Sequence, residues 1–140
     1  MNYPLFFLLV LISWSLVFIY GKIKCMYPNY KDILSIQITE YFDGWLLIHF
    51  IIYTLAGIFF PKSFYLSMLI GIIWELIEIW IGNTKPEILK GIGDCDKNNK
   101  FSNLSLSNDK KGYWWYGQIQ DIYADFLGFM FGKYVIKPLI

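Results

Sequence analysis

Residues 71–82 read Gly71-Ile-Ile-Trp-Glu75-Leu-Ile-Glu78-Ile-Trp-Ile-Gly82, so two acids follow a glycine inside an apolar run. A second apolar run carries acids and glycines at the same spacing, at Asp121, Asp125, Gly128 and Gly132. On an α-helix of about 3.6 residues per turn, each set falls on one face. A carboxylate in hydrocarbon is costly unless it is paired, hydrated or protonated, so these acids are candidate functional residues.

The composition is that of a membrane protein. Of the 140 residues 56% are hydrophobic, the mean hydropathy is +0.44, and the apolar residues come in long runs. The net charge of +1 gives no reason to expect nucleic acid as a partner. All twelve basic residues are lysines, which argues against a bidentate phosphate clamp or a voltage sensor.

We expect an all-α polytopic membrane protein, in which a single domain over residues 1–140 forms a four-helix transmembrane bundle. The expected spans are residues 3–20, 45–60, 63–82 and 118–136. The first span is interpreted as a retained helix, because no basic residue precedes it and no small-residue cleavage pattern follows it. Pro61 and Lys62 form a tight connection, so the second and third spans should be antiparallel neighbours.

The two segments between these spans are more polar. Residues 31–42 are either a short amphipathic helix at the membrane surface or a loop packed on the bundle. Residues 83–117 read as a polar loop, and the aromatic run 113–116 at its end is typical of a membrane interface.

The orientation of the bundle follows from the lysines. Four spans place nine of the twelve lysines on the side of loop 83–117, so the positive-inside rule predicts a cytoplasmic loop. The sequon that begins at Asn103 and the cysteines Cys25 and Cys95 share that side and would suit a lumenal loop instead. We predict the cytoplasmic orientation, and two cysteines that are unrelated to each other.

Depth along the spans brings the acids together. The third span ends, and the second and fourth begin, on the side of the long loop, so their polar residues fall within the same half of the bilayer at a rise of about 1.5 Å per residue. We therefore expect a pocket that opens toward the long loop, with Asp43 at its rim. The residues expected to line it are His49, Tyr53, Glu75, Glu78, Asp121 and Asp125.

Such a pocket has three possible uses. It can bind a divalent metal ion or another cation, since carboxylates suit Mg²⁺, Mn²⁺ or Ca²⁺ and an imidazole adds a preference for transition metals. It can share protons, in a proton relay or in acid–base catalysis. It can also be a structural hydrogen-bond network. The candidate metal ligands are His49, Glu75, Glu78, Asp121 and Asp125.

Glycines should allow the helices to approach closely at several heights. The candidate packing positions are Gly57, Gly71, Gly82, Gly128 and Gly132. Gly128 and Gly132 match the small-xxx-small pattern, and we expect them to pack within one chain rather than between two chains.

Three motifs resemble a known family. Asp43-Gly-Trp-Leu-Leu-Ile-His49-Phe-Ile-Ile-Tyr53 is similar to the aspartate-to-histidine opening of VanZ-like membrane proteins. Glu75-Leu-Ile-Glu78 resembles their acidic third-helix motif, and Asp121-Ile-Tyr-Ala-Asp125-Phe-Leu-Gly128 resembles their closing motif. Many VanZ-like members have Gln where Glu78 stands, and a related bacterial inner-membrane family of unknown function, with Glu-x-x-Glu, matches equally well.

The resemblance covers about residues 41–132 and implies a small multi-pass membrane protein. Whether the chain is an enzyme stays open. The main hypothesis is a membrane protein with a cation or proton in its acidic pocket, whose partners are the lipid bilayer and a lipid-like or small-molecule ligand. The alternatives are a membrane-embedded enzyme that acts on a lipid-linked substrate, with Glu or Asp as base, and a purely structural polar network.

Overall fold

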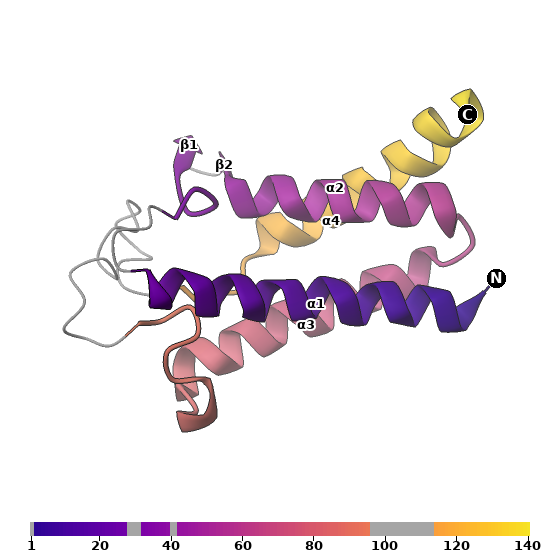
Figure 1. Cartoon of the computed structure of the whole chain (residues 1–140). Helices are drawn as coiled ribbons and strands as arrows, with labels where there is room; N and C mark the ends of the chain where they lie inside the picture. Colours follow the sequence, from indigo (N-terminus) through magenta and orange to yellow (C-terminus); the bar gives the residue numbers. More distant parts are fainter. Residues whose placement is uncertain (1, 28–31, 40–41, 96–113) are drawn as a thin grey trace.

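The computed structural model describes residues 2–27, 32–39, 42–95 and 114–140, and every structural statement below refers to these. The chain is mostly helical. Its four α-helices are α1 (Tyr3–Met26), α2 (Gly44–Phe59), α3 (Phe64–Thr84) and α4 (Ile119–Phe131) (Figure 1). The shorter elements are the strands β1 (Gln37–Thr39) and β2 (Phe42–Asp43), the 3-10 helices η1 (Glu87–Leu89) and η4 (Lys137–Leu139), and the π-helical η3 (Gly132–Ile136).

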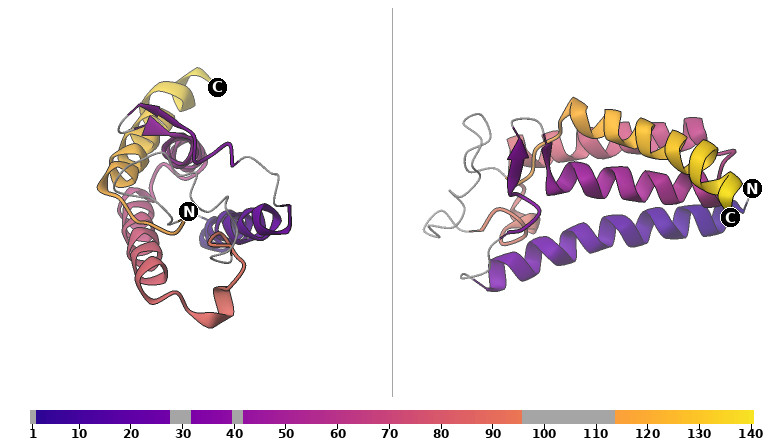
Figure 2. Two further views of the ribbon diagram at one scale, coloured as in Figure 1. Left: turned by 90° about the vertical axis from the view of Figure 1, so that its left-hand side faces the viewer. Right: turned by 90° about the horizontal axis from the view of Figure 1, so that it is seen from above.

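Both ends of the chain lie at the same end of the molecule, and β1, β2 and the loop after η1 lie at the other (Figures 1 and 2). The four helices expected from the sequence are all present. α1 continues six residues beyond the expected end at residue 20, because nothing between Gly21 and Met26 interrupts a helix. α4 begins at Ile119 and η3 prolongs it to Ile136, which matches the expected fourth helix.

The segment before α2 is not an amphipathic helix where the structure describes it. Asp32 accepts hydrogen bonds from the backbone amides of Leu34 and Ser35, at 3.2 and 3.3 Å. This side chain offers the backbone a turn in place of a helix. β1 and β2 then pair antiparallel, and β2 leads directly into α2. Of the two alternatives for residues 31–42, the loop packed on the bundle is the one that the described residues fit.

Glycines bring α2 and α4 together side by side. A Cβ atom at Gly128 would collide with the carbonyl oxygen of Phe50, and one at Gly132 with that of Thr54. From the other helix, a Cβ atom at Gly57 would collide with the carbonyl oxygen of Phe129. The small-xxx-small pair therefore faces α2 of the same chain. The other two candidate packing glycines also lie at close approaches, Gly71 against Tyr53 and Asp125, and Gly82 against the Trp115 carbonyl.

α1 stands farther from its neighbours than α2 does from α4, as the end-on view in Figure 2 shows. Aromatic side chains bridge the distance. The rings of Trp14 and Trp74 lie 5.1 Å apart, and those of Phe18 and Trp115 lie 5.3 Å apart. Trp74, Ile81, Trp114 and Trp115 form the buried hydrophobic cluster on which the second half of α1 packs.

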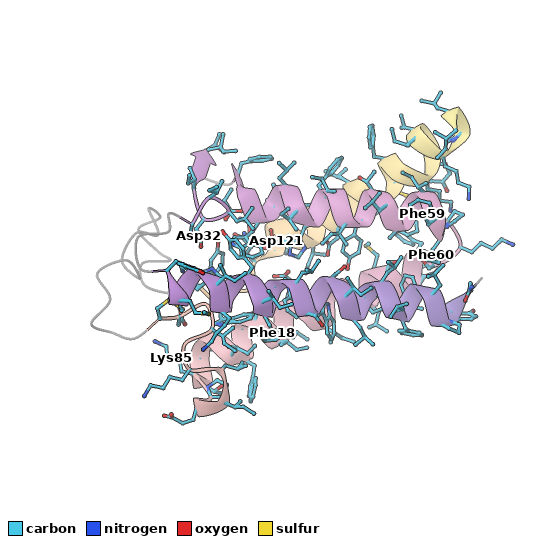
Figure 3. All side chains as sticks on the ribbon, in the orientation of Figure 1. Phe18, Asp32, Phe59, Phe60, Lys85 and Asp121 are labelled. Carbon is cyan, nitrogen blue, oxygen red and sulfur yellow. A yellow bond between two sulfur atoms is a disulfide. The ribbon has the colours of Figure 1, made fainter. Side chains whose placement is uncertain are left out.

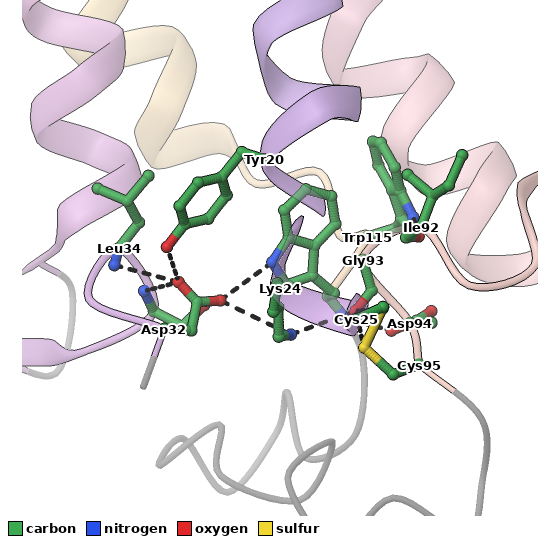
Figure 4. Close-up of polar contacts among 12 residues, drawn as sticks. Tyr20, Lys24, Cys25, Asp32, Leu34, Ile92, Gly93, Asp94, Cys95 and Trp115 are labelled. Carbon is green, nitrogen blue, oxygen red and sulfur yellow. Dashed lines mark hydrogen bonds and ion pairs between the residues drawn. A yellow bond between two sulfur atoms is a disulfide. The ribbon is translucent and has the colours of Figure 1, made fainter. Parts of the chain in front are cut away.

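Cys25 and Cys95 form a disulfide between the last turn of α1 and the loop that follows η1 (Figure 4). The expectation that they are unrelated is wrong. Gly91 and Gly93 have φ values of 77° and 78°, in the left-handed region that favours glycine, and they turn the chain back toward α1. The amide of Gly93 then donates to the carbonyl of Gly21 at 3.1 Å. The two cysteines are 70 residues apart in the sequence, so their spacing does not indicate that they lie together.

Two of the helices, α1 and α3, are long and apolar enough to cross a membrane, with mean hydropathies of 2.2 and 1.8. α2 is a shorter apolar helix. Large apolar side chains project outward along these helices (Figure 3). Examples with more than half of their surface exposed are Leu16, Ile19, Phe59, Leu69 and Leu76. An exposed apolar surface of this extent indicates contact with a membrane or another apolar partner.

Candidate metal centre

Asp43 fixes the start of α2 and thus the height of His49. Its Oδ1 accepts a hydrogen bond from the amide of Leu46 at 2.9 Å, as expected of an N-cap residue. Its Oδ2 accepts one from the hydroxyl of Tyr116 at 2.8 Å. Burial, and then the neighbouring Asp43 carboxylate, raise the pKa of Tyr116, so this hydroxyl keeps its proton and remains a donor. Asp43 lies at the rim as a helix cap.

His49 lies between the acids of two other helices. Its Nδ1 is 2.8 Å from Oδ1 of Asp125 on α4, and its Nε2 is 3.8 Å from Oε1 of Glu75 on α3. A proton on Nδ1 is held by the hydrogen bond to Asp125 and leaves the lone pair on Nε2, directed toward Glu75. This is the arrangement by which a carboxylate orients a metal-binding histidine.

Three ligand atoms come together at this point. One atom each from His49, Glu75 and Asp121 forms a group in which all separations are within 4.8 Å. Glu75 and Asp121 are buried, with 3% and 2% of their surface exposed. Oε1 of Glu75 is itself buried and has no hydrogen-bond partner among the described residues. A buried carboxylate oxygen without a donor calls for a bound ion, a proton or water.

Gln118 holds the two carboxylates of this group in place. Its backbone amide donates to Oε2 of Glu75 at 2.8 Å, and its side-chain Nε2 donates to Oδ1 of Asp121 at 3.3 Å. Gln118 is the N-cap residue of α4, and its amide hydrogen bonds to Glu75 on α3 instead of to a carbonyl of its own helix. Gln118 is not among the residues that the sequence predicts to line the pocket, although it is a possible hydrogen-bond partner of the acids if the network is structural. Its position one residue before α4 is the signal in the sequence that could have indicated its contact with the acids.

The remaining candidates lie around this group. Glu78 lines a small cavity together with His49 and Asp121. The volume of this cavity, about 10 Å³, approaches what one water molecule requires. Tyr53 lies about one turn farther along α2 than His49, and its hydroxyl donates to the carbonyl of Ser67 at 3.0 Å. A Cβ atom at Gly71 would meet this hydroxyl, so the glycine makes room for Tyr53.

The charges of the site do not balance. Glu75, Glu78, Asp121 and Asp125 bring four carboxylates, and His49 is the only basic side chain that forms an ion pair with any of them in the described part of the chain. Even a protonated imidazole would neutralise only one of the four charges. Carboxylates removed from water are strongly destabilised unless a cation or protons compensate them. The arrangement therefore favours occupancy by positive charge.

The separation between the ligand atoms of His49 and Glu75 is suitable for a metal ion. Two donors that each lie about 2.0–2.2 Å from one ion are about 3–4 Å apart. The 3.8 Å between Nε2 of His49 and Oε1 of Glu75 is too long for a hydrogen bond and falls within this range. His49, Glu75 and Asp121 thus offer one nitrogen and two carboxylate groups, a set that suits Zn²⁺ or Mn²⁺.

Compared with known proteins, the chain matches no family model, no curated protein and no solved structure. The resemblance to VanZ-like membrane proteins therefore stays a prediction from three short motifs.

Proposed function

We propose that this protein spans a membrane with its four helices and binds a divalent transition metal ion between α2, α3 and α4. His49, Glu75 and Asp121 are the ligands, and Asp125 orients His49. The observation that carries the proposal is the buried Oε1 of Glu75, which lacks a hydrogen-bond donor and faces Nε2 of His49 at 3.8 Å. Glu78, on the adjacent small cavity, is close enough to compensate further charge or hold a water molecule.

The membrane location is supported by the outer surface. α1 and α3 pass the length and hydropathy requirements of a span, and their exposed residues are mainly large and apolar. α2 is only 16 residues long, which a locally thinned bilayer can accommodate. Extraction tests this part of the proposal. The protein should stay with the membrane in alkaline carbonate and enter solution only with detergent, whereas release by carbonate would overturn it.

Metal analysis of the purified full chain tests the site. We expect about one ion per chain after incubation with Zn²⁺ or Mn²⁺ and removal of the excess. Glu75→Gln and Asp121→Asn should each abolish stoichiometric binding. Glu87→Gln is the matched control, because Glu87 is an exposed acid in η1, outside the site. Substoichiometric metal that is the same in all four proteins would overturn the proposal.

A proton relay is the second candidate function, because His49 connects two carboxylates. Asp125 lies 2.8 Å from one ring nitrogen, and Glu75 lies 3.8 Å from the other. A proton accepted from one side of the ring could be released on the other. This function predicts proton flux across vesicles that is lost in a His49→Gln variant and needs no bound metal. The metal analysis above therefore separates the two candidates.

A further inference from the structure

A second cavity, of about 170 Å³, lies between α1, α2 and α3. Its walls are mainly apolar, with Ser13, Ser67, His49, Tyr53 and Glu78 as the polar exceptions. Apolar residues that define the walls are Leu9, Val10, Val17, Ile52, Ala56 and Ile70. An apolar cavity of about 150 Å³ is large enough to hold a benzene molecule. This space is therefore large enough for a hydrocarbon group.

The cavity exists because bulky aromatic contacts keep α1 at a distance from α2 and α3. Near the start of α1, the ring of Phe6 packs on that of Phe60, with the ring centres 5.3 Å apart. Farther along, Trp14 packs on Trp74 at 5.1 Å. Both contacts join α1 to its neighbours through large side chains, and the shorter side chains between them leave the gap unfilled. The disulfide at Cys25 further fixes the far end of α1.

The cavity is elongated and opens sideways. Its lining on α2 extends from Trp45 to Phe59, about 21 Å at a rise of about 1.5 Å per residue. Three of its lining residues belong to the outer surface as well, since Leu9, Leu55 and Phe59 are 42%, 48% and 65% exposed. A narrow space of this length suits a linear chain better than a compact ligand, and its mouth lies on the apolar outer face.

One end of the cavity is polar. His49 and Glu78 line it near the start of α2, at the same height as the metal centre. Toward Phe59 and Phe60 the lining is mainly apolar, with Ser67 as the exception, and these two phenylalanines lie farther along the bundle than Asp121 (Figure 3). The lining thus changes from polar to apolar along the bundle in the way that a lipid does from its headgroup to its chain.

We propose that this cavity binds the hydrocarbon chain of a bilayer lipid, which enters sideways between α1 and α2 with its polar end toward His49 and Glu78. The inference rests on the membrane location given under the proposed function, but not on the metal ion. It assigns the lipid-like ligand to one cavity and to one chemical group, the hydrocarbon chain of a bilayer lipid.

The test uses the full chain in phosphatidylcholine vesicles that contain a small fraction of phosphatidylcholine with a photoactivatable group on one acyl chain. After illumination, the labelled peptides are mapped by mass spectrometry. We expect labels to concentrate on the cavity-lining segments around Ser13 and Ala56. Labelling spread evenly over the exposed faces of α1 and α3 would overturn the proposal.

Two serines of α1 provide a matched pair of variants. The hydroxyl of Ser13 donates to the carbonyl of Leu9 at 2.9 Å, and that of Ser15 donates to the carbonyl of Leu11 at 2.7 Å. Ser13 lines the cavity, whereas Ser15 is exposed outside it. Ser13→Phe should fill the cavity and lower the labelling of Ala56 about fivefold or more, because a filled cavity has no space for a chain. Ser15→Phe should leave it unchanged.

A second variant guards against misfolding of the first. Ala56→Leu adds a smaller side chain from the opposite wall and should also lower the labelling at Ser13. Equal labelling in the unmodified chain, Ser13→Phe and Ala56→Leu would overturn the proposal. Metal content measured on the same samples separates it from the proposed function. In the unmodified chain, absence of specific labelling with the ion present counts against the lipid site alone, and absence of the ion with specific labelling present counts against the metal site alone.

Discussion

Nδ1 of His49 lies 2.8 Å from Oδ1 of Asp125, and this contact joins the α2 histidine to an α4 acid that is itself only 1% exposed. The hydrogen bond sets which ring nitrogen is left to face Glu75 and Asp121. Asp125 is therefore a positioning residue of the proposed metal site and is not one of its three proposed ligands.

Asp125→Asn tests this role. The amide oxygen can still accept from His49, but the negative charge that strengthens the imidazole as a ligand is lost. We expect the affinity for Zn²⁺ to fall by about 10- to 100-fold, as is typical of such outer partners, while the stoichiometry at saturation stays the same. Titration with a competing chelator measures the change. An unaltered affinity would mean that His49 is oriented by something other than Asp125.

Gly132→Ala should destabilise the contact between α2 and α4. The added methyl group would collide with the carbonyl oxygen of Thr54, and backbone on both sides limits the adjustment. We expect a loss of about 1–3 kcal/mol of stability, seen as a lower melting temperature in detergent. Leu127→Ala, on the exposed face of the same helix, is the control and should change the melting temperature little. Equal effects would show that the close approach is unimportant.

Replacing Cys25 by serine should loosen α1. The disulfide closes a stretch of 70 residues, for which the chain-entropy account gives a contribution of about 4 kcal/mol as an upper value. We expect lower thermal stability and faster proteolysis after α1, and the same effect in Cys95→Ser and in the double variant. A double variant that loses the sum of the two single effects would show that the sulfurs act separately.

The disulfide and the lysines predict opposite orientations. Nine lysines favour a cytoplasmic long loop, whereas a disulfide on that side forms and persists in an oxidising compartment. We expect the disulfide to indicate the orientation, so that reporters fused to either end of the chain are active in the cytoplasm. A bulky thiol reagent that cannot cross membranes should label Cys25 only after reduction, from outside the cell. Active reporters on the opposite side would restore the prediction from the lysines. Asn103 of the sequon lies outside the described residues.

The helices and the depth of the polar residues follow from the sequence, because both depend on local pattern. Pro61 ends an apolar run, so the turn between α2 and α3 falls where it is expected. Counting turns from each helix end places His49, Glu75 and Asp121 at one height, and the structure brings atoms of all three within 4.8 Å. Glycine spacing likewise indicates which helix faces are available for close approach.

Features that depend on distant contacts were not accessible in this way. The pairing of Cys25 with Cys95 requires the loop after η1 to turn back at two glycines, and nothing in the spacing of the cysteines indicates it. The role of Gln118 depends on which helix its backbone amide contacts, here α3 through Glu75. The distance of α1 from the bundle is set by how Trp14 and Trp74 pack, which hydropathy alone does not encode.

Residues 114–118 connect the disulfide region to the metal centre. The amide of Trp114 donates to Oδ1 of Asp94, next to Cys95, at 2.7 Å, and the indole of Trp115 donates to the carbonyl of Ile92 at 2.9 Å. Three residues later, Gln118 holds Glu75 and Asp121. Residues 114–118 thus form a short segment that joins the loop at the disulfide to two carboxylates of the proposed metal site. We expect the redox state of the disulfide and the affinity of this site for Zn²⁺ to vary together, although the two lie on different parts of the chain.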